Sequence, residues 1–231
     1  MKKLGLVGGM SWVSTVDYYR FINESVNEKL GGLNYAECVI YSVNFNAFVS
    51  NNTAGKWDDT FQILLSACKN LKRAGAEAIV LCANTAHAVA DRLETEIDLP
   101  IIHIVTATAE AIQKAGLRKV GLLGTKFTME MDFYKDKLTG LGIEPIVPAT
   151  QENRDFIQNT LRDELGKGII REETKQGYLA IIDELIARGA EGIILGCTEI
   201  PMIISQDDVT VPVFDTTRIH SDAAVAFALS E

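Results

Sequence analysis

The feature that most constrains the fold is an internal repeat. The segment Gly75–Thr85, GAEAIVLCANT, is matched 114 residues later by Gly189–Glu199, GAEGIILGCTE. Two further pairs of segments match in the same order, at offsets of 116 and 112 residues: Lys3–Gly8 with Lys119–Gly124, and Leu99–Ile102 with Val211–Phe214. Three matches at a nearly constant offset predict that the chain builds the same α/β unit twice.

Apolar runs alternate with helical segments in both halves. Apolar runs without polar alternation are typical of parallel strands covered by helices on both faces. Strands are predicted at 2–8, 37–43, 77–82, 100–104, 119–124, 143–147, 192–196 and 211–214, and helices at 13–30, 58–74, 86–95, 106–115, 128–140, 151–166, 173–188, 200–204 and 218–229. The expected fold class is α/β, with two pseudo-symmetric parallel-sheet halves.

The predicted halves have a boundary near residue 105 and no Gly/Ser linker between them. We expect the first half to cover residues 1–104, with a C-terminal helix within 216–231 packing on it. The second half is expected to cover 105–215. Ligands of such sheets bind beyond the carboxyl ends of the strands, which is where the motifs below fall.

Composition narrows the class of partner. The chain has 231 residues, 47% of them hydrophobic and 23% charged, and a net charge of −9. This charge, without a basic block, argues against nucleic acid. No apolar stretch is long enough to span a membrane, and no signal peptide is recognisable. The four cysteines show no CxxC spacing and are expected to be reduced. We therefore expect a cytoplasmic protein with a small-molecule ligand and no nucleic-acid or membrane partner.

Four strand ends carry residues suited to ligand binding or chemistry. Glycines there let backbone N–H groups approach an anion, and short polar residues can bind a ligand or cap a helix. The four segments are Gly8–Trp12, Cys82–His87, Gly124–Thr128 and Gly196–Glu199.

The repeat places the thiol of Cys197 opposite the methyl group of Ala83. A free cysteine is more often a small buried apolar residue than a catalyst. Its place in a repeated strand-end loop favours the catalyst, and a helix N-terminus there would lower the thiol pKa. Cys82 precedes Ala83 by one residue, so its side chain should point to the opposite face of the sheet.

The remaining histidine and cysteine residues are interpreted structurally. Cys82 and His87 form one potential ligand pair, and no second pair completes a metal site. The histidines His87, His103 and His220 are expected to be hydrogen-bonded structural residues. We read Glu199 as a charge that complements a helix N-terminus.

At these motifs the chain resembles the aspartate/glutamate racemase family over essentially its full length. The matching segments are Gly8–Met10, Asn84–His87, Leu123–Thr125 and Gly196–Glu199. The Met-Ser-Trp and Cys-x-Asn-Thr motifs are similar to those of the branch that contains L-aspartate/glutamate-specific and broad-specificity amino-acid racemases. The resemblance implies two halves facing across a central cleft, and racemisation without pyridoxal phosphate or metal. One residue takes the α-proton from one face of the substrate, and another returns a proton to the opposite face.

The resemblance also implies roles for individual residues. It places the two bases at Cys197 and at position 83, where the family has Cys or, in this branch, Thr, and where this chain has Ala83. Either a natural protein works differently here, or a substitution has disabled the position. The substrate-binding residues implied by position are Met10, Asn52, Asn84, Thr85, Thr125, Lys167 and Thr198. Asn52 stands where this branch tends to have Gln. Lys167 lies close to the position of a family lysine, but the resemblance does not fix the alignment of the two residues.

These observations predict a cofactor-independent racemase of aspartate or glutamate that transfers the α-proton between two bases and is impaired at Ala83. We expect it to form a homodimer. Two alternatives stay open. A single-cysteine decarboxylase similar to arylmalonate decarboxylases would suit the lone thiol of Cys197, and a non-catalytic amino-acid-binding protein would need no base.

Overall fold

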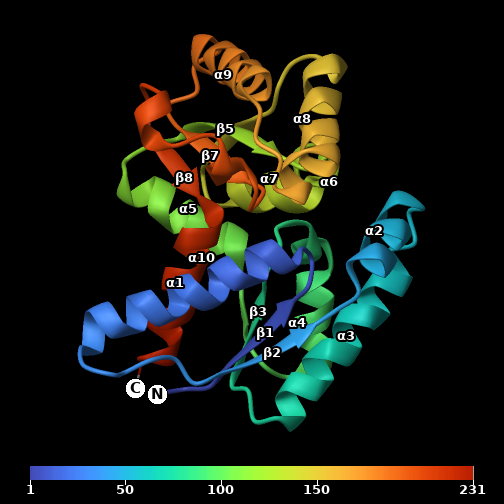
Figure 1. Ribbon diagram of the computed structural model, residues 1–231, viewed down its shortest axis with the longest axis vertical. Coiled ribbons are helices and arrows are strands. Elements are labelled where there is room, and N and C mark those ends of the chain that lie inside the picture. The colour runs from blue at the N-terminus through green and yellow to red at the C-terminus, as the bar shows by residue number, and fades with distance from the viewer. Residues whose placement is uncertain (231) are drawn as a thin grey trace. The chain divides into compact units, whose positions relative to one another are not determined.

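A computed structural model describes residues 1–230 of the chain. They divide into two compact units, each with its own sheet (Figure 1). Unit 1 contains residues 1–104 and 220–230, and unit 2 contains residues 105–219. The chain therefore passes between the units twice, after Ile104 and after Ile219.

Unit 1 is built on four parallel strands in the order β2-β1-β3-β4. Its elements are β1 (Leu4–Gly8), α1 (Trp12–Leu30), β2 (Cys38–Ser42), α2 (Phe45–Thr53), α3 (Trp57–Arg73), β3 (Ala78–Leu81), the 3-10 helix η1 (Thr85–Val89), α4 (Ala90–Ile97) and β4 (Ile101–Ile102). The last helix, α10 (Thr216–Ala228), begins in unit 2 and continues into unit 1.

Unit 2 repeats this arrangement with the order β6-β5-β7-β8, again all parallel. Its elements are α5 (Ile104–Lys114), which starts at the boundary, β5 (Lys119–Gly124), α6 (Lys126–Glu130), α7 (Asp132–Gly140), β6 (Glu144–Ile146), α8 (Gln151–Asp163), η2 (Leu165–Lys167), α9 (Glu172–Ala187), β7 (Ile193–Gly196), η3 (Ile200–Met202), η4 (Gln206–Asp208) and β8 (Val213–Asp215). The predicted α/β class with two parallel sheets is confirmed.

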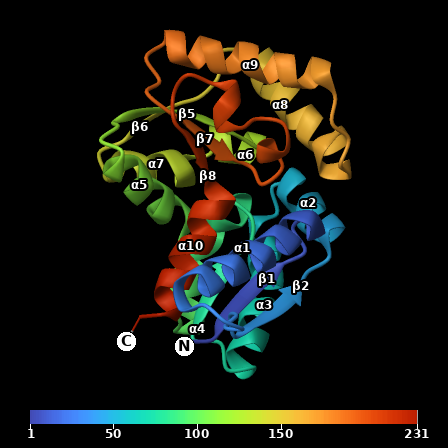
Figure 2. The same ribbon diagram turned by 60° about the vertical axis from the view of Figure 1, so that its left-hand side comes forward.

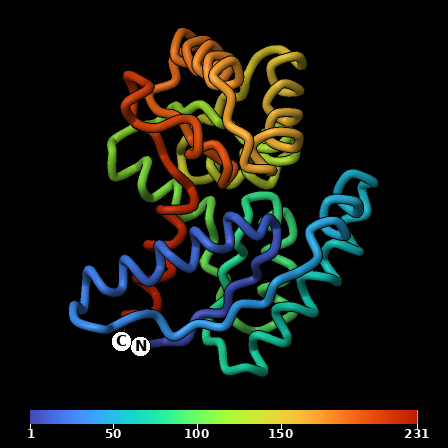
Figure 3. The backbone as a smooth tube through the Cα atoms, viewed as in Figure 1, coloured from blue at the N-terminus to red at the C-terminus, as the bar shows by residue number. Residues whose placement is uncertain are grey.

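The sheet of unit 1 is buried on both faces because its strands are apolar throughout. Leu4 and Leu6 face one side, where they pack with Tyr18 of α1 and Val225 of α10. The opposite face packs against α3 and α4. Figure 3 shows the start of β1 beside the end of α10, where the Lys2 N–H donates to the Ala228 carbonyl at 2.8 Å. The C-terminal helix thus closes one face of the first sheet.

The core of unit 2 follows the same rule. Leu123 of β5 and Leu195 of β7 pack with Ile157 of α8 and with Ile181 and Leu185 of α9. Figure 2 shows α8 and α9 over one face of this sheet. Burial of these branched side chains, at about 25 cal/mol per Å² of apolar surface, holds each sheet to its helices.

Several predicted boundaries are wrong for local reasons. The strand predicted at 100–104 ends at Ile102, because the Ile104 N–H donates to the ring of His87 and α5 begins there. The helix predicted at 128–140 is two helices, since Met131 adopts an extended conformation between them. Helix α2 was not predicted; the Asn44 side chain accepts from the Asn46 N–H at its start.

Candidate active site

The strand-end loop of unit 1 follows β3. The Cys82 N–H donates to the Val7 carbonyl at 3.0 Å, which extends the pairing with β1 by one residue. The Ala83 N–H then turns back to the Leu81 carbonyl at 2.8 Å. Cys82 is buried with Leu4 on one face of the sheet, whereas Ala83 belongs to the cluster on the other face. The prediction that Cys82 and Ala83 point to opposite faces is confirmed.

The neighbouring loop after β1 is packed tightly against β2. Gly9 has a φ of +83°, and a Cβ there would lie 2.4 Å from the Val43 carbonyl oxygen, so only glycine fits. The Gly9 N–H donates to the Thr15 hydroxyl at 2.8 Å. The Met10 side chain is buried in the apolar core of unit 1. The Gly9 amide and the Met10 thioether are thus both committed to internal contacts.

Asn84 and Thr85 are buried polar residues at the start of η1. The Asn84 side chain makes no capping hydrogen bond to this 3-10 helix. The Asn84 side chain therefore does not cap this helix.

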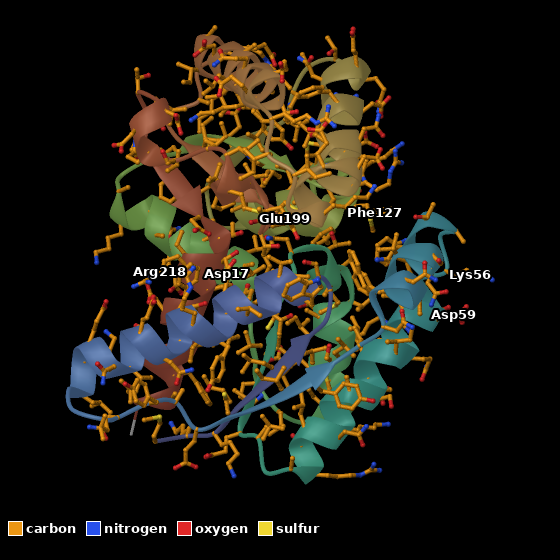
Figure 4. All side chains as sticks on the ribbon, viewed as in Figure 1. Asp17, Lys56, Asp59, Phe127, Glu199 and Arg218 are labelled. Atoms are coloured by element: carbon orange, nitrogen blue, oxygen red, sulfur yellow. The ribbon has the colours of Figure 1, made fainter. Side chains whose placement is uncertain are left out.

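The strand-end loop of unit 2 holds a thiol against a carboxylate. Gly196, the last residue of β7, pairs with Gly124 of β5, so the two strands end side by side. Cys197 Sγ donates to Glu199 Oε2 at 2.9 Å, and the Thr198 hydroxyl donates to the same oxygen at 2.9 Å. Glu199 is only 8% exposed, in the loop that follows β7 (Figure 4). One buried carboxylate oxygen therefore accepts from both neighbours.

This environment changes the acidity of the thiol. Burial, the charge of Glu199 and the hydrogen bond to it raise the pKa of the Cys197 thiol well above its ordinary value, and the backbone N–H groups of Thr198 and Glu199 oppose them only in part. The expectation of a lowered pKa is wrong. The helix that follows, η3, is a single 3-10 turn of three residues, too short to supply a macrodipole. At neutral pH Cys197 is a protonated thiol.

Three other predicted binding residues have local partners or lie on the surface. Thr125 caps α6 by accepting from the Thr128 N–H at 3.3 Å. Asn52 is buried in α2 and accepts the Thr60 hydroxyl at 2.5 Å. Lys167 lies exposed at the end of η2. Cys197 and Thr198 therefore lie together in the loop after β7, whereas Asn52 lies in α2 and Lys167 at the end of η2.

Residues 1–230 contain no group of three or more side chains arranged to hold a metal ion. All four cysteines are free thiols. None of the helices in this part of the chain has both the length and the apolar character needed to cross a bilayer.

Residues 7–224 match the family described as Asp/Glu/Hydantoin racemase. The chain belongs to this family. The family resemblance drawn from the sequence is therefore confirmed.

Individual relatives of the chain carry names of the same family. The broad specificity amino-acid racemase RacX of Bacillus subtilis is 23% identical and covers 98% of both chains. A crystal structure of a candidate Asp/Glu racemase from Yersinia pestis is 47% identical, with a TM-score of 0.93 and full coverage of both chains. PH1733, an aspartate racemase homologue from Pyrococcus horikoshii, is 41% identical, with a TM-score of 0.86 and full coverage of both. Membership of the family supports an amino-acid racemase as the class of enzyme.

One contact of the Cys197 thiol was not predicted from the sequence. Glu199 was read as a charge for a helix N-terminus, but its carboxylate is the hydrogen-bond acceptor of the Cys197 thiol. The signal was present in the spacing. A carboxylate two residues after a thiol, in a loop that leaves a strand, can fold back onto the sulfur.

Proposed function

We propose that this protein acts on aspartate or glutamate, by removing the α-proton from one face and returning a proton to the other. The observation that carries the proposal is the hydrogen bond between Cys197 and Glu199 at the end of β7. It places a buried acid, the Cys197 thiol, directly beside a proton acceptor, the Glu199 carboxylate. The proton can pass between them without any other group. The relatives named as aspartate or broad-specificity racemases support an amino acid as the substrate.

The first chemical step starts from the neutral thiol. The S–H bond of Cys197 breaks as its proton passes to the Glu199 carboxylate, 2.9 Å away. The thiolate then takes the α-proton of the L-substrate, re-forming S–H, while the electron pair of the broken C–H bond moves into the substrate carboxyl group as an enediolate. An α-proton beside a carboxylate is very weakly acidic, so hydrogen-bond donors must stabilise this charge. These steps use only protein groups, so we propose that neither pyridoxal phosphate nor a metal takes part.

The second step needs a proton donor for the opposite face, which the repeat places at position 83. Ala83 is 8% exposed and carries a methyl group, so it has no proton to give. We call each base position with its strand-end loop a half-site. We propose that the unit 2 half-site has its reacting group, Cys197, and that the unit 1 half-site, at Ala83, lacks one. The chain should exchange the α-proton on one face and invert the substrate slowly.

Binding of the substrate carboxylates is assigned to polar residues of the strand-end loops. Asn84 and Thr85 fit this role best because they are buried polar groups one and two residues after position 83. The further proposed contacts, carried over from the family by position, are Met10, Asn52, Thr125, Lys167 and Thr198. We also propose a cytoplasmic homodimer, which cell fractionation and sedimentation analysis would test.

A second candidate function is decarboxylation of a malonate-type substrate. It is favoured by the resting protonation state: a neutral Cys197 thiol can protonate an enediolate from one face, and such a reaction needs nothing at Ala83. Decarboxylation would release carbon dioxide without interconverting amino-acid enantiomers.

The experiment that tests the proposal restores the missing group. Ala83→Thr and Ala83→Cys should raise racemisation of L-aspartate or L-glutamate at least tenfold over the parent, because a positioned acid or base contributes about 10²–10⁴-fold. Chiral chromatography measures the D-product, and a carbon dioxide assay with an arylmalonate runs in parallel. Carbon dioxide without inversion would replace the racemase by the decarboxylase. Substrate binding with neither product would leave an amino-acid-binding protein.

A further inference from the structure

A buried imidazole holds the backbone of the vacant base position. His87, in η1, is 3% exposed. Its Nε2 lies 3.2 Å from the Ile104 backbone nitrogen, and its Nδ1 lies 3.0 Å from the Ala83 carbonyl oxygen. A backbone N–H can only donate and a carbonyl can only accept. Nε2 is therefore the acceptor and Nδ1 carries the proton, so these two partners fix the tautomer.

The two partners of His87 lie at functionally different places. Ala83 occupies the position of the second base, and Ile104 is the last residue of unit 1 before the chain first passes into unit 2. One imidazole thus connects the strand-end loop with the first chain crossing. Because the carbonyl carbon and the Cβ of residue 83 share one Cα, holding the carbonyl also fixes the direction in which the side chain leaves.

The surroundings keep this imidazole neutral. The ring of His103 lies 4.8 Å from that of His87, and the ring of His220 lies 5.4 Å away. His220 is itself held at both nitrogens: Nε2 donates to the Ile102 carbonyl at 2.6 Å, and Nδ1 accepts from the Tyr18 hydroxyl at 2.7 Å. Burial and these two neighbouring histidines lower the pKa of His87 well below its ordinary value. Protonation would place a hydrogen on Nε2, against the Ile104 N–H.

The second unit shows that a buried histidine is not a requirement of the fold. The repeat places Pro201 at the position of His87. Unit 2 instead ties β7 to the start of α10 through the Thr216 hydroxyl, which donates to the Leu195 carbonyl at 2.9 Å. That bond lies two residues before the base position Cys197. In unit 2 a backbone group holds the carbonyl of the base position, because the Ile200 N–H donates to the Cys197 carbonyl at 3.1 Å. In unit 1 a side chain, the imidazole of His87, bonds the carbonyl of Ala83.

We propose that His87, as its Nδ1–H tautomer, is a positioning residue that sets the backbone of residue 83 for proton transfer. The inference rests on the proposed function, because it assigns His87 to the second base position of that reaction. His87 does not touch the substrate; it acts through residue 83.

The kinetic test uses the Ala83→Thr background, in which the second base is restored. His87→Leu, which can make neither bond, should lower kcat by about 10²-fold, the cost of a misplacement of roughly 1 Å, with KM nearly unchanged. His87→Gln keeps one donor and one acceptor and should recover most of kcat. His220→Leu is the matched control: it removes an equally buried histidine of the same cluster, and should lower the melting temperature while leaving kcat nearly unchanged.

A second readout does not depend on activity. In the parent chain, His87→Leu should speed hydrogen exchange of the backbone amides of 83–87, while those of β3 stay protected, and His87→Gln should restore the slow rates. Long-range ¹H–¹⁵N correlation should show the proton of His87 on Nδ1. If Ala83→Thr proves inactive, the vacant-base claim fails, and amide exchange alone decides the role of His87. Unchanged exchange in His87→Leu, or an equal fall in kcat in His220→Leu, would overturn the proposal.

Discussion

The loop after β3 in unit 1 and the loop after β7 in unit 2 occupy the same place in a repeated fold, but they have different chemistry. The unit 2 loop places a protonatable thiol, Cys197, on the carboxylate of Glu199. The unit 1 loop places a methyl group, that of Ala83, at the equivalent position, and the carbonyl of Ala83 accepts a hydrogen bond from His87. The repeat therefore determines where a reacting group can lie, and a single side chain in each loop decides whether one is present.

The two loops also differ in how they are anchored. In unit 1 the anchor is an imidazole that bonds the carbonyl of residue 83 itself. In unit 2 the anchor is the Thr216 hydroxyl, which bonds the Leu195 carbonyl within the strand. The carbonyl of the base position is bonded in both units, by the Ile200 N–H at Cys197 and by the imidazole of His87 at Ala83. The difference is that a side chain makes this bond in unit 1, which is the arrangement expected if position 83 is built to carry a base.

The largest expected effect comes from removing the one reacting group. In the Ala83→Thr background, Cys197→Ala should lower the racemisation rate by about 10²–10⁴-fold, because an acid/base group is lost. Chiral chromatography with L- and D-aspartate measures both directions. Cys82→Ala is the matched control, since this thiol faces the opposite side of the sheet from Ala83 and should leave the rate nearly unchanged. An equal loss of racemisation rate in the two variants would contradict the claim that only Cys197 is a reacting group.

A smaller effect is expected from Glu199→Gln in the same background. The amide cannot accept the thiol proton, so the racemisation rate should fall at least about tenfold. The same change removes a negative charge that helps to raise the pKa of Cys197. The pH at which the thiol becomes reactive to iodoacetamide should therefore move down, toward the ordinary cysteine value. A lower thiol pKa with full activity would show that Glu199 is not the proton acceptor.

The smallest effect is expected at Cys82, which should matter to stability alone. Cys82→Ser buries a hydroxyl in an apolar cluster and should cost about 1–3 kcal/mol of unfolding free energy. Burial raises the pKa of the Cys82 thiol in the folded protein. Its neutral form therefore contributes stability that is full below the unfolded pKa of about 8.5 and is lost as the pH rises above it.

Serine does not titrate there, so the gap in melting temperature between parent and Cys82→Ser should shrink from pH 7 to pH 10. The racemisation rate of Cys82→Ser, measured in the Ala83→Thr background, is compared with that of Cys197→Ala. A large loss of activity at Cys82→Ser with an unchanged melting temperature would contradict the placement of this side chain away from the reacting face.

Much of the fold could be predicted because it depends on patterns that repeat. The matched segments gave both central strands of each sheet, and the period of two along a strand separated Cys82 from Ala83. The end of β4 at Ile102 could not be predicted, because it depends on a hydrogen bond from Ile104 to His87, 17 residues away in the chain. Helix α2 was missed because its apolar spacing is irregular and its start depends on the cap from Asn44.

The candidate site was predicted in its residues more than in its chemistry. The alignment of Cys197 with Ala83 followed from the offset of the repeat alone. The acidity of the thiol did not, because it depends on how the loop folds Glu199 onto the sulfur and on how short η3 is. A sequence shows that a carboxylate is near in the chain, whereas its effect on a pKa requires the distance and the burial.

The most direct test of the central claim, one complete half-site and one vacant half-site, is α-hydrogen exchange in the unaltered chain. L-aspartate and L-glutamate are incubated in heavy water, proton NMR follows loss of the α-hydrogen, and chiral chromatography follows the D-enantiomer. We predict slow deuterium incorporation with much less D-product, and no incorporation in Cys197→Ala. D-product formed as fast as deuterium is incorporated would contradict it, because another group would then be delivering protons at the face assigned to Ala83.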